Sequence, residues 1–121
     1  MPFSTLMYHE IRKAGEFRPE HRSFIDIKQD YSDILPPPLF VTLENFKVQM
    51  AYLQTGRYHT LTLDEVRAYY YRQKAIPEKS VLLTFDDCYQ SVKRYAYPVL
   101  KAFGFHAAAF VVTGWLHDKP K

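Results

Sequence analysis

Two neighbouring aspartates, Asp86 and Asp87, are the residues of this sequence best suited to chemistry. They directly follow residues 80–85, an apolar run without polar alternation that is typical of a strand covered on both faces in a parallel sheet. α/β folds build their sites at the carboxyl ends of such strands. Because successive residues leaving a strand point in different directions, we expect one carboxylate to ligate a cation and the other to handle a proton.

Two other interpretations of this motif have to be weighed. One aspartate could cap the following helix, and the short motif taken alone favours that role. An acidic strand end also occurs in nucleotide-hydrolysing proteins. However, none of the four glycines belongs to a G-x-x-x-x-G-K-[ST] phosphate-binding loop, so the sequence excludes a nucleotide site of that kind.

The elements that must position the aspartates indicate an α/β fold. We expect parallel strands near residues 3–8, 80–85 and 107–112, with helices between them and the last strand buried. No internal repeat is visible. A complete α/β barrel takes about 250 residues, so 121 residues would make about half of one; the N-terminal portion of a distorted (β/α) barrel, in a truncated polypeptide, is what the family resemblance described below implies.

The helices are predicted from the spacing of apolar residues and from caps. A helix over residues 43–55 begins after Thr42 and ends at Gly56. Thr62 and Glu65 form a capping box for a second helix, which must end before a proline at position 77. A short strand over 58–61 would precede it.

The third helix and a long insertion complete the prediction. The third helix runs from Val92 to Gly104, where Pro98 either kinks it or begins its second half. Residues 11–41 show no sustained period and hold a Pro36–Pro38 run, which indicates a functional flap or a mobile insertion, with a small strand near residues 24–27.

Composition excludes several classes of protein. The 121 residues are 47% hydrophobic, enough for one domain or part of one, and the net charge of +3 does not predict a nucleic-acid partner. The aromatic and basic residues 67–74 are explained by a solvated helix face. A single cysteine excludes a disulfide framework. We find no signal peptide and no run long enough to span a membrane, so the sequence predicts a soluble chain with no transmembrane segment.

An ordered series of motifs resembles the N-terminal part of a polysaccharide deacetylase, the NodB-homology family (carbohydrate esterase family 4). The matching segments are Leu6–Ile11, the Phe46–Leu63 region, Leu82–Asp87, Tyr89, Pro98–Leu100, Phe105 and Ala108–Val111. The resemblance covers nearly the whole chain apart from residues 12–41. It therefore describes residues 1–121 as a partial deacetylase domain with the insertion at about 11–41.

The resemblance implies a metal-dependent hydrolase that removes N-acetyl groups from an N-acetylglucosamine-type polysaccharide. In the family's T-F-D-D-G motif the first aspartate is the catalytic base and the second a metal ligand, which carries over to Asp86 and Asp87. The divalent metal is commonly zinc. Amide hydrolysis agrees with this assignment, because it needs a Lewis acid on the carbonyl and a base for the attacking water.

Two departures from the family pattern concern the metal site. The family completes that site with an H-[ST]-x-x-H pair, but none of the five histidines here are four residues apart. We therefore expect the histidine ligands, the catalytic acid and the acetate pocket downstream of this chain. Cys88 stands where the family has Gly, which costs ~1–3 kcal/mol if its φ is positive. Cys88 could also bind metal as a thiolate, although a small buried apolar role is favoured.

Four further residues are candidates for lining the pocket: His9, Thr84, Cys88 and Tyr89. His9 ends the first strand and would point at the same rim as Asp86, although a lone histidine there is more often structural. Tyr89 either closes the site or packs under the next helix. The other histidines, at positions 21, 59, 106 and 117, are predicted to be surface or structural residues.

Two functions remain open at this point. The parent protein is predicted to be a metal-dependent deacetylase of an N-acetylated glycan, and the family resemblance implies work in the cell envelope. Alternatively, this 121-residue chain is inactive and acts at most as a carbohydrate-binding or self-association module through exposed strand edges. Residues 11–41 either grip a polymer or cover the rim.

Overall fold

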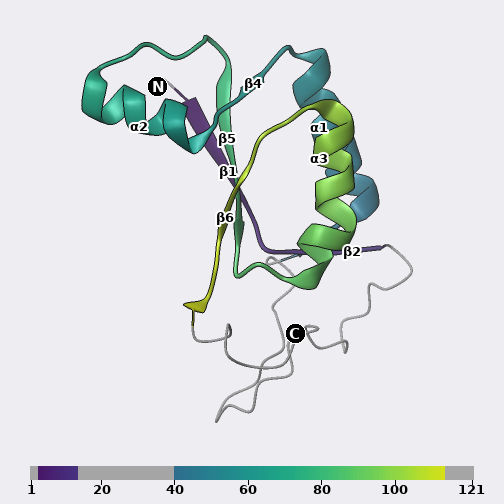
Figure 1. The fold of residues 1–121 in the computed structure, drawn as a ribbon. Helices are drawn as coiled ribbons and strands as arrows, with labels where there is room; N and C mark the ends of the chain where they lie inside the picture. Colours follow the sequence, from purple (N-terminus) through teal and green to yellow (C-terminus); the bar gives the residue numbers. More distant parts are fainter. Residues whose placement is uncertain (1–2, 14–39, 114–121) are drawn as a thin grey trace.

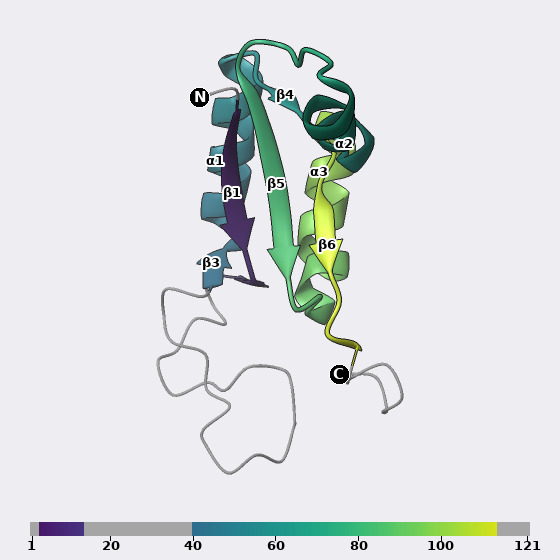
Figure 2. The same cartoon turned by 90° about the vertical axis from the view of Figure 1, so that its left-hand side faces the viewer.

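The computed structural model describes residues 3–13 and 40–113 of the chain. Its centre is strand β5 (Ser80–Asp86), which is flanked on both edges (Figure 2). β1 (Phe3–Tyr8) pairs along one edge, while β4 (His59–Thr60) and β6 (Ala108–Phe110) share the other. All pairs are parallel, which confirms the α/β class and the first two strand ranges. β6 covers only the middle of the predicted range 107–112.

Helices α1 (Leu43–Thr55) and α3 (Tyr97–Phe103) cover one face of the sheet (Figure 1). The apolar spacing of the first helix predicts its bounds correctly, and the buried stripe packs against alternate residues of β5. The core formed in this way contains Phe46, Met50, Leu53, Val81, Leu83, Phe85, Val99 and Leu100.

The two ends of α1 are fixed by different means. Thr42 caps the start, because its hydroxyl accepts a hydrogen bond from the Asn45 amide at 3.1 Å. Gly56 ends the helix with an ordinary φ of −76°, and the left-handed residue is Arg57, with a φ of 57°. The glycine is needed for space instead, since a Cβ there would lie 2.7 Å from the ring of Tyr58.

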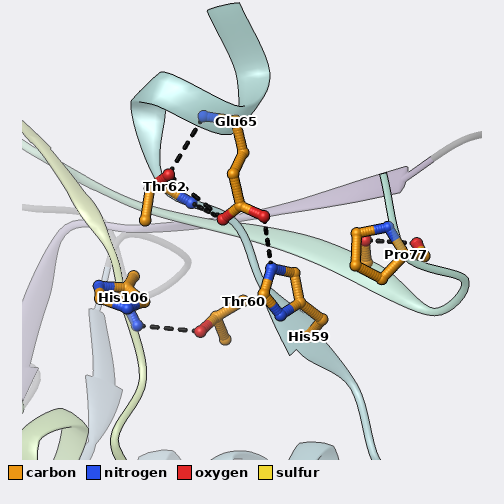
Figure 3. A network of polar contacts seen from close by, with 7 residues as sticks. His59, Thr60, Thr62, Glu65, Pro77 and His106 are labelled. Carbon is orange, nitrogen blue, oxygen red and sulfur yellow. Dashed lines mark hydrogen bonds and ion pairs between the residues drawn. The ribbon is translucent and has the colours of Figure 1, made fainter. Parts of the chain in front are cut away.

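Helix α2 (Leu63–Arg72) lies at the end of the sheet where β1 and β5 begin (Figure 1). The predicted capping box is present, with Thr62 and Glu65 bonded to each other's backbone amides. Figure 3 shows that Glu65 also reaches His59, with 2.7 Å between Oε2 and Nε2. The helix ends before Pro77, as expected, because Gln73 adopts a left-handed φ of 52°.

The predicted third helix is divided into two parts. A π-helical turn over Val92–Ala96, labelled η3, leads into α3, and the Tyr97 amide donates to the carbonyl of Val92. Pro98 is therefore the second residue of α3, directly after the π-helical turn. Gly104 ends the helix with a left-handed φ of 69°.

The ends of the predicted insertion form a second, small sheet. β2 (Glu10–Arg12) pairs in parallel with β3 (Phe40–Thr42). Both ends of the predicted range 11–41 therefore lie in strands. The small strand expected near residues 24–27 lies outside the described residues.

The outer strands are more exposed than the sequence predicts. The side chains of Met7, Phe110 and Val111 are 64%, 54% and 52% exposed. The expectation that the last strand is buried is therefore wrong for the described residues, where β1 and β6 each pair with β5 alone. Within the same part of the chain, no helix is long and apolar enough to cross a membrane.

Candidate active site at the end of β5

The parallel register of β1 and β5 brings His9 and Asp86 together. Tyr8, the last residue of β1, lies opposite Phe85, so His9 follows β1 next to Asp86, the last residue of β5, at the same carboxyl edge of the sheet. The Nε2 atom of His9 is 3.7 Å from Oδ2 of Asp86, and these side chains are 17% and 31% exposed. An imidazole and a carboxylate at this distance form a pair that can exchange protons with a bound substrate and with water.

The chain turns sharply directly after Asp86. Asp87 and Cys88 both adopt left-handed conformations, with φ values of 72° and 51°. The amide of Asp87 donates to the carbonyl of Phe110 at 3.0 Å, which ties the turn to the end of β6. Because the strand geometry ends at Asp86, the second carboxylate is free to take a different direction from the first.

Cys88 is exposed, which corrects the expectation of a small buried residue. The reason is the left-handed turn, which carries position 88 out of the sheet. Partial burial, and secondarily the charge of Asp87, raises the pKa of the Cys88 thiol.

Thr84 and Tyr89 lie on either side of the aspartate pair in the chain and are both buried. Their exposed fractions are 5% and 6%. For Tyr89 the burial favours packing beneath the following helix over closing the site from outside. Thr84 lies in the middle of the sheet, opposite Met7 on one side and Ala108 on the other.

Tyr8 supports the strand ends from within the sheet. Its ring stacks on Phe85 with centroids 5.3 Å apart and meets Phe46 edge-on at 5.2 Å. Its hydroxyl donates to Oε1 of Gln49 at 2.7 Å, and burial raises its pKa to about 12. The phenol therefore stays protonated and serves as a fixed donor next to His9.

Comparisons with known proteins identify the family. Residues 73–121 match the polysaccharide deacetylase model. The poly-β-1,6-N-acetyl-D-glucosamine N-deacetylase of Staphylococcus aureus (strain MSSA476) is 32% identical over 117 residues, 95% of this chain and 37% of that protein. The structure of IcaB from Ammonifex degensii matches with a TM-score of 0.68 and 27% identity, covering 97% of this chain and 41% of that one. A de-N-acetylase from Aggregatibacter actinomycetemcomitans shares the fold, with a TM-score of 0.71, 22% identity, and coverage of 97% of this chain and 40% of that one.

The chain matches the N-terminal part of the polysaccharide deacetylases. It spans less than half the length of the relatives just described, and corresponds to the N-terminal part of the NodB-type barrel. The family resemblance predicted from the sequence is thereby confirmed, and so is the barrel portion as the class of fold.

The polysaccharide deacetylases are a metalloenzyme class, and the described residues do not form a complete metal site. Among them no three His, Cys, Asp or Glu side chains cluster as a metal would require. His59 and His106 lie near the other end of the sheet, by Thr60 and Glu65 (Figure 3). A catalytic zinc takes about three protein ligands. The donor set seen here is thus insufficient for zinc by itself.

The sequence analysis missed a buried ion pair that lies next to the candidate site. Glu10 and Arg12 are 0% and 1% exposed and bonded to each other. In a strand, side chains two residues apart point to the same face, so the spacing of the two opposite charges could have predicted the ion pair. The sequence analysis predicted no strand at residues 10–12, and the pair was therefore missed.

Proposed function

We propose that the protein of which this chain is part is a hydrolase that removes N-acetyl groups from a polymer of N-acetylglucosamine. The observation that carries the proposal is the pairing of His9 with Asp86, directly before Asp87, at the carboxyl edge of a parallel sheet. The names of the curated relatives support the same class of substrate.

The residues divide the reaction between them. Asp86 accepts the proton of the attacking water, and His9 gives a proton to the amine that leaves as acetate is released. The catalytic acid expected downstream of this chain stays a prediction; we propose His9 as a proton donor within the chain because its Nε2 atom lies 3.7 Å from Oδ2 of Asp86. The phenol of Tyr8 holds the end of β1, on which His9 depends.

Asp87 is proposed as a ligand of a divalent cation, commonly zinc in this family. When bound, such an ion supplies Lewis acidity toward the acetamido carbonyl. Its remaining ligands have to come from outside the described residues, because these hold no cluster of three ligating groups. Cys88 is not part of the proposed donor set, which takes only Asp87 from this turn.

The proposal is tested by acetate release from an N-acetylglucosamine oligomer by the full-length protein. Asp86→Asn keeps the size of the side chain but removes the base, so we expect turnover to fall by about 10²–10⁴-fold. The matched control is Asp64→Asn, an exposed aspartate in the first turn of α2. Activity of Asp86→Asn equal to that of the control would remove Asp86 from its role.

A cell-envelope location and a function of residues 11–41 in gripping or covering the glycan belong to the same proposal. The substrate of the relatives is poly-β-1,6-N-acetyl-D-glucosamine by name, and β2 and β3, which border the segment, pair next to the site. Deleting residues 14–39 and measuring KM for long against short oligomers separates gripping from covering, since only gripping favours the long ones.

A further inference from the structure

The ion pair of Glu10 and Arg12 is buried and well formed. The Nε and Nη2 atoms of Arg12 donate to the two carboxylate oxygens of Glu10 at 3.0 and 3.2 Å. The guanidinium also lies 4.4 Å from the centre of the Phe40 ring, across the small sheet. Two parallel bonds and a stacked ring hold the arginine in a single orientation.

A buried ion pair contributes little to stability, because desolvation of both charges offsets their attraction. Its clearer effect is geometric. Because both groups belong to β2, the pair sets the local shape of this strand and holds the guanidinium against Phe40, which ties β2 to β3.

The other face of β2 is held as firmly. Ile11 points away from the ion pair and is 0% exposed within the core. Its amide donates to the hydroxyl of Ser91 at 3.0 Å, and Ser91 precedes the π-helical turn η3. β2 thus runs crosswise beneath the carboxyl ends of the strands, fixed from both faces (Figure 1).

His9 is the single residue between β1 and β2. On one side the register of Tyr8 with Phe85 sets its backbone, and on the other the pairing of Glu10 with Phe40 does so. An imidazole on a backbone fixed at both neighbours has few positions open to it. The distance from His9 to Asp86 accordingly depends on how β2 is held.

We propose that Glu10 and Arg12 are positioning residues whose buried ion pair fixes β2 and thereby keeps the imidazole of His9 beside Asp86. This inference rests on the deacetylase function proposed above. It assigns no contact with substrate to either residue, because they act through His9.

A double-mutant cycle in the full-length protein tests the proposal. Glu10→Gln keeps the shape but weakens the pair, so we expect kcat for acetate release to fall about tenfold with KM unchanged. In a His9→Ala background the same change should cause no further loss, because the group it positions is gone. A purely structural role would lower activity by the same factor in both backgrounds and would overturn the proposal.

A substitute variant and a control variant complete the test. If Glu10→Gln does not fold, Arg12→Lys replaces it, since lysine keeps the charge but loses the two parallel bonds. Glu78→Gln, an exposed residue before β5, is the control and should leave kcat unchanged.

A crystal structure of the variant separates this inference from the proposed function. We expect the Nε2 to Oδ2 distance between His9 and Asp86 to lengthen beyond the 3.7 Å seen here. That measurement needs no activity, so it decides the positioning role even if the wild-type protein releases no acetate. An unchanged distance in a folded variant would overturn the inference.

Discussion

At the scale of single residues, the site depends on where the strand stops. Asp86 is the last residue of β5, and the left-handed turn at Asp87 and Cys88 separates the two carboxylates. The base and the metal ligand proposed above can thus be neighbours in sequence without serving the same purpose. The turn also accounts for the glycine that the family has at position 88, because a left-handed conformation is unstrained only without a Cβ.

Cys88→Gly is expected to stabilise the protein. The change removes the strain of a side chain at a φ of 51° and should raise the free energy of unfolding by about 1 kcal/mol. Urea denaturation of the full-length protein measures the effect. Cys88→Ala is the matched control, because it removes the thiol but keeps the Cβ and should leave stability unchanged. Equal stabilisation by both variants would assign the effect to the thiol instead of the backbone.

Residue positions could be predicted best where local chemistry decides them. The caps of Thr42 and Thr62 follow from side-chain oxygens that satisfy nearby amides, and both are present. The sequence also predicts His9 at the same rim as Asp86, but their contact at 3.7 Å depends on a strand register across more than seventy positions, which no local pattern encodes. The exposure of Cys88 was missed for a similar reason, since it follows from the turn.

At the scale of elements, the spacing of apolar residues predicted the helices better than the short outer strands. The apolar stripe of α1 fixed its bounds, because one face alone can be buried. The strands β2 and β3 were not predicted, because each has three residues and their pairing joins segments far apart in the chain. The burial of β6 was overestimated because a strand's sequence does not reveal how many neighbours cover it.

The start of α2 should make stability depend on pH. The pKa of Glu65 is lowered, chiefly by the hydrogen bond from the Thr62 amide and also by His59, against a smaller effect of burial. The unfolded chain then binds the proton more readily than the folded one. Stability from this group is present above the ordinary pKa of glutamate, about 4.3, and is lost as the pH falls through the lowered value.

Glu65→Gln should therefore be less stable than wild type at neutral pH and nearly equal to it in acid. Urea denaturation midpoints of the two proteins, measured from pH 7 to pH 3, test this convergence. Asp64→Asn, on the same helical turn, is the comparison for a general loss of charge at the helix start. A difference between Glu65→Gln and wild type that is constant with pH would contradict the assigned cause.

At the scale of the whole molecule, the metal site is the feature that these residues leave incomplete. Asp87 alone cannot hold a catalytic zinc, because no cluster of three ligating side chains exists among the described residues. In titration calorimetry, we expect the full-length protein to bind zinc stoichiometrically and a polypeptide of residues 1–121 to show no tight binding. Tight binding by the shorter polypeptide would mean that a full set of ligands is already present within it.

The open sheet edge and the exposed apolar side chains predict how residues 1–121 behave when isolated. Within the described residues, β1 leaves one edge unpaired, and Met7, Phe110 and Val111 expose more than half of their side chains. Unpaired edges and apolar surface favour association between copies. Analytical ultracentrifugation should therefore show a sedimentation coefficient that rises with concentration.

A charge on the free edge provides the matched test of that association. Thr5 is exposed on β1, and Thr5→Lys places a cation where an approaching strand would have to pair. We expect this variant to shift the association to concentrations several-fold higher, whereas Lys93→Glu, exposed on η3 away from that edge, should leave it unchanged. A monomer at all concentrations would show that the open edge of β1 is not an association surface. Equal effects of both substitutions would point to charge in general, because only the edge mechanism depends on the position of the new side chain.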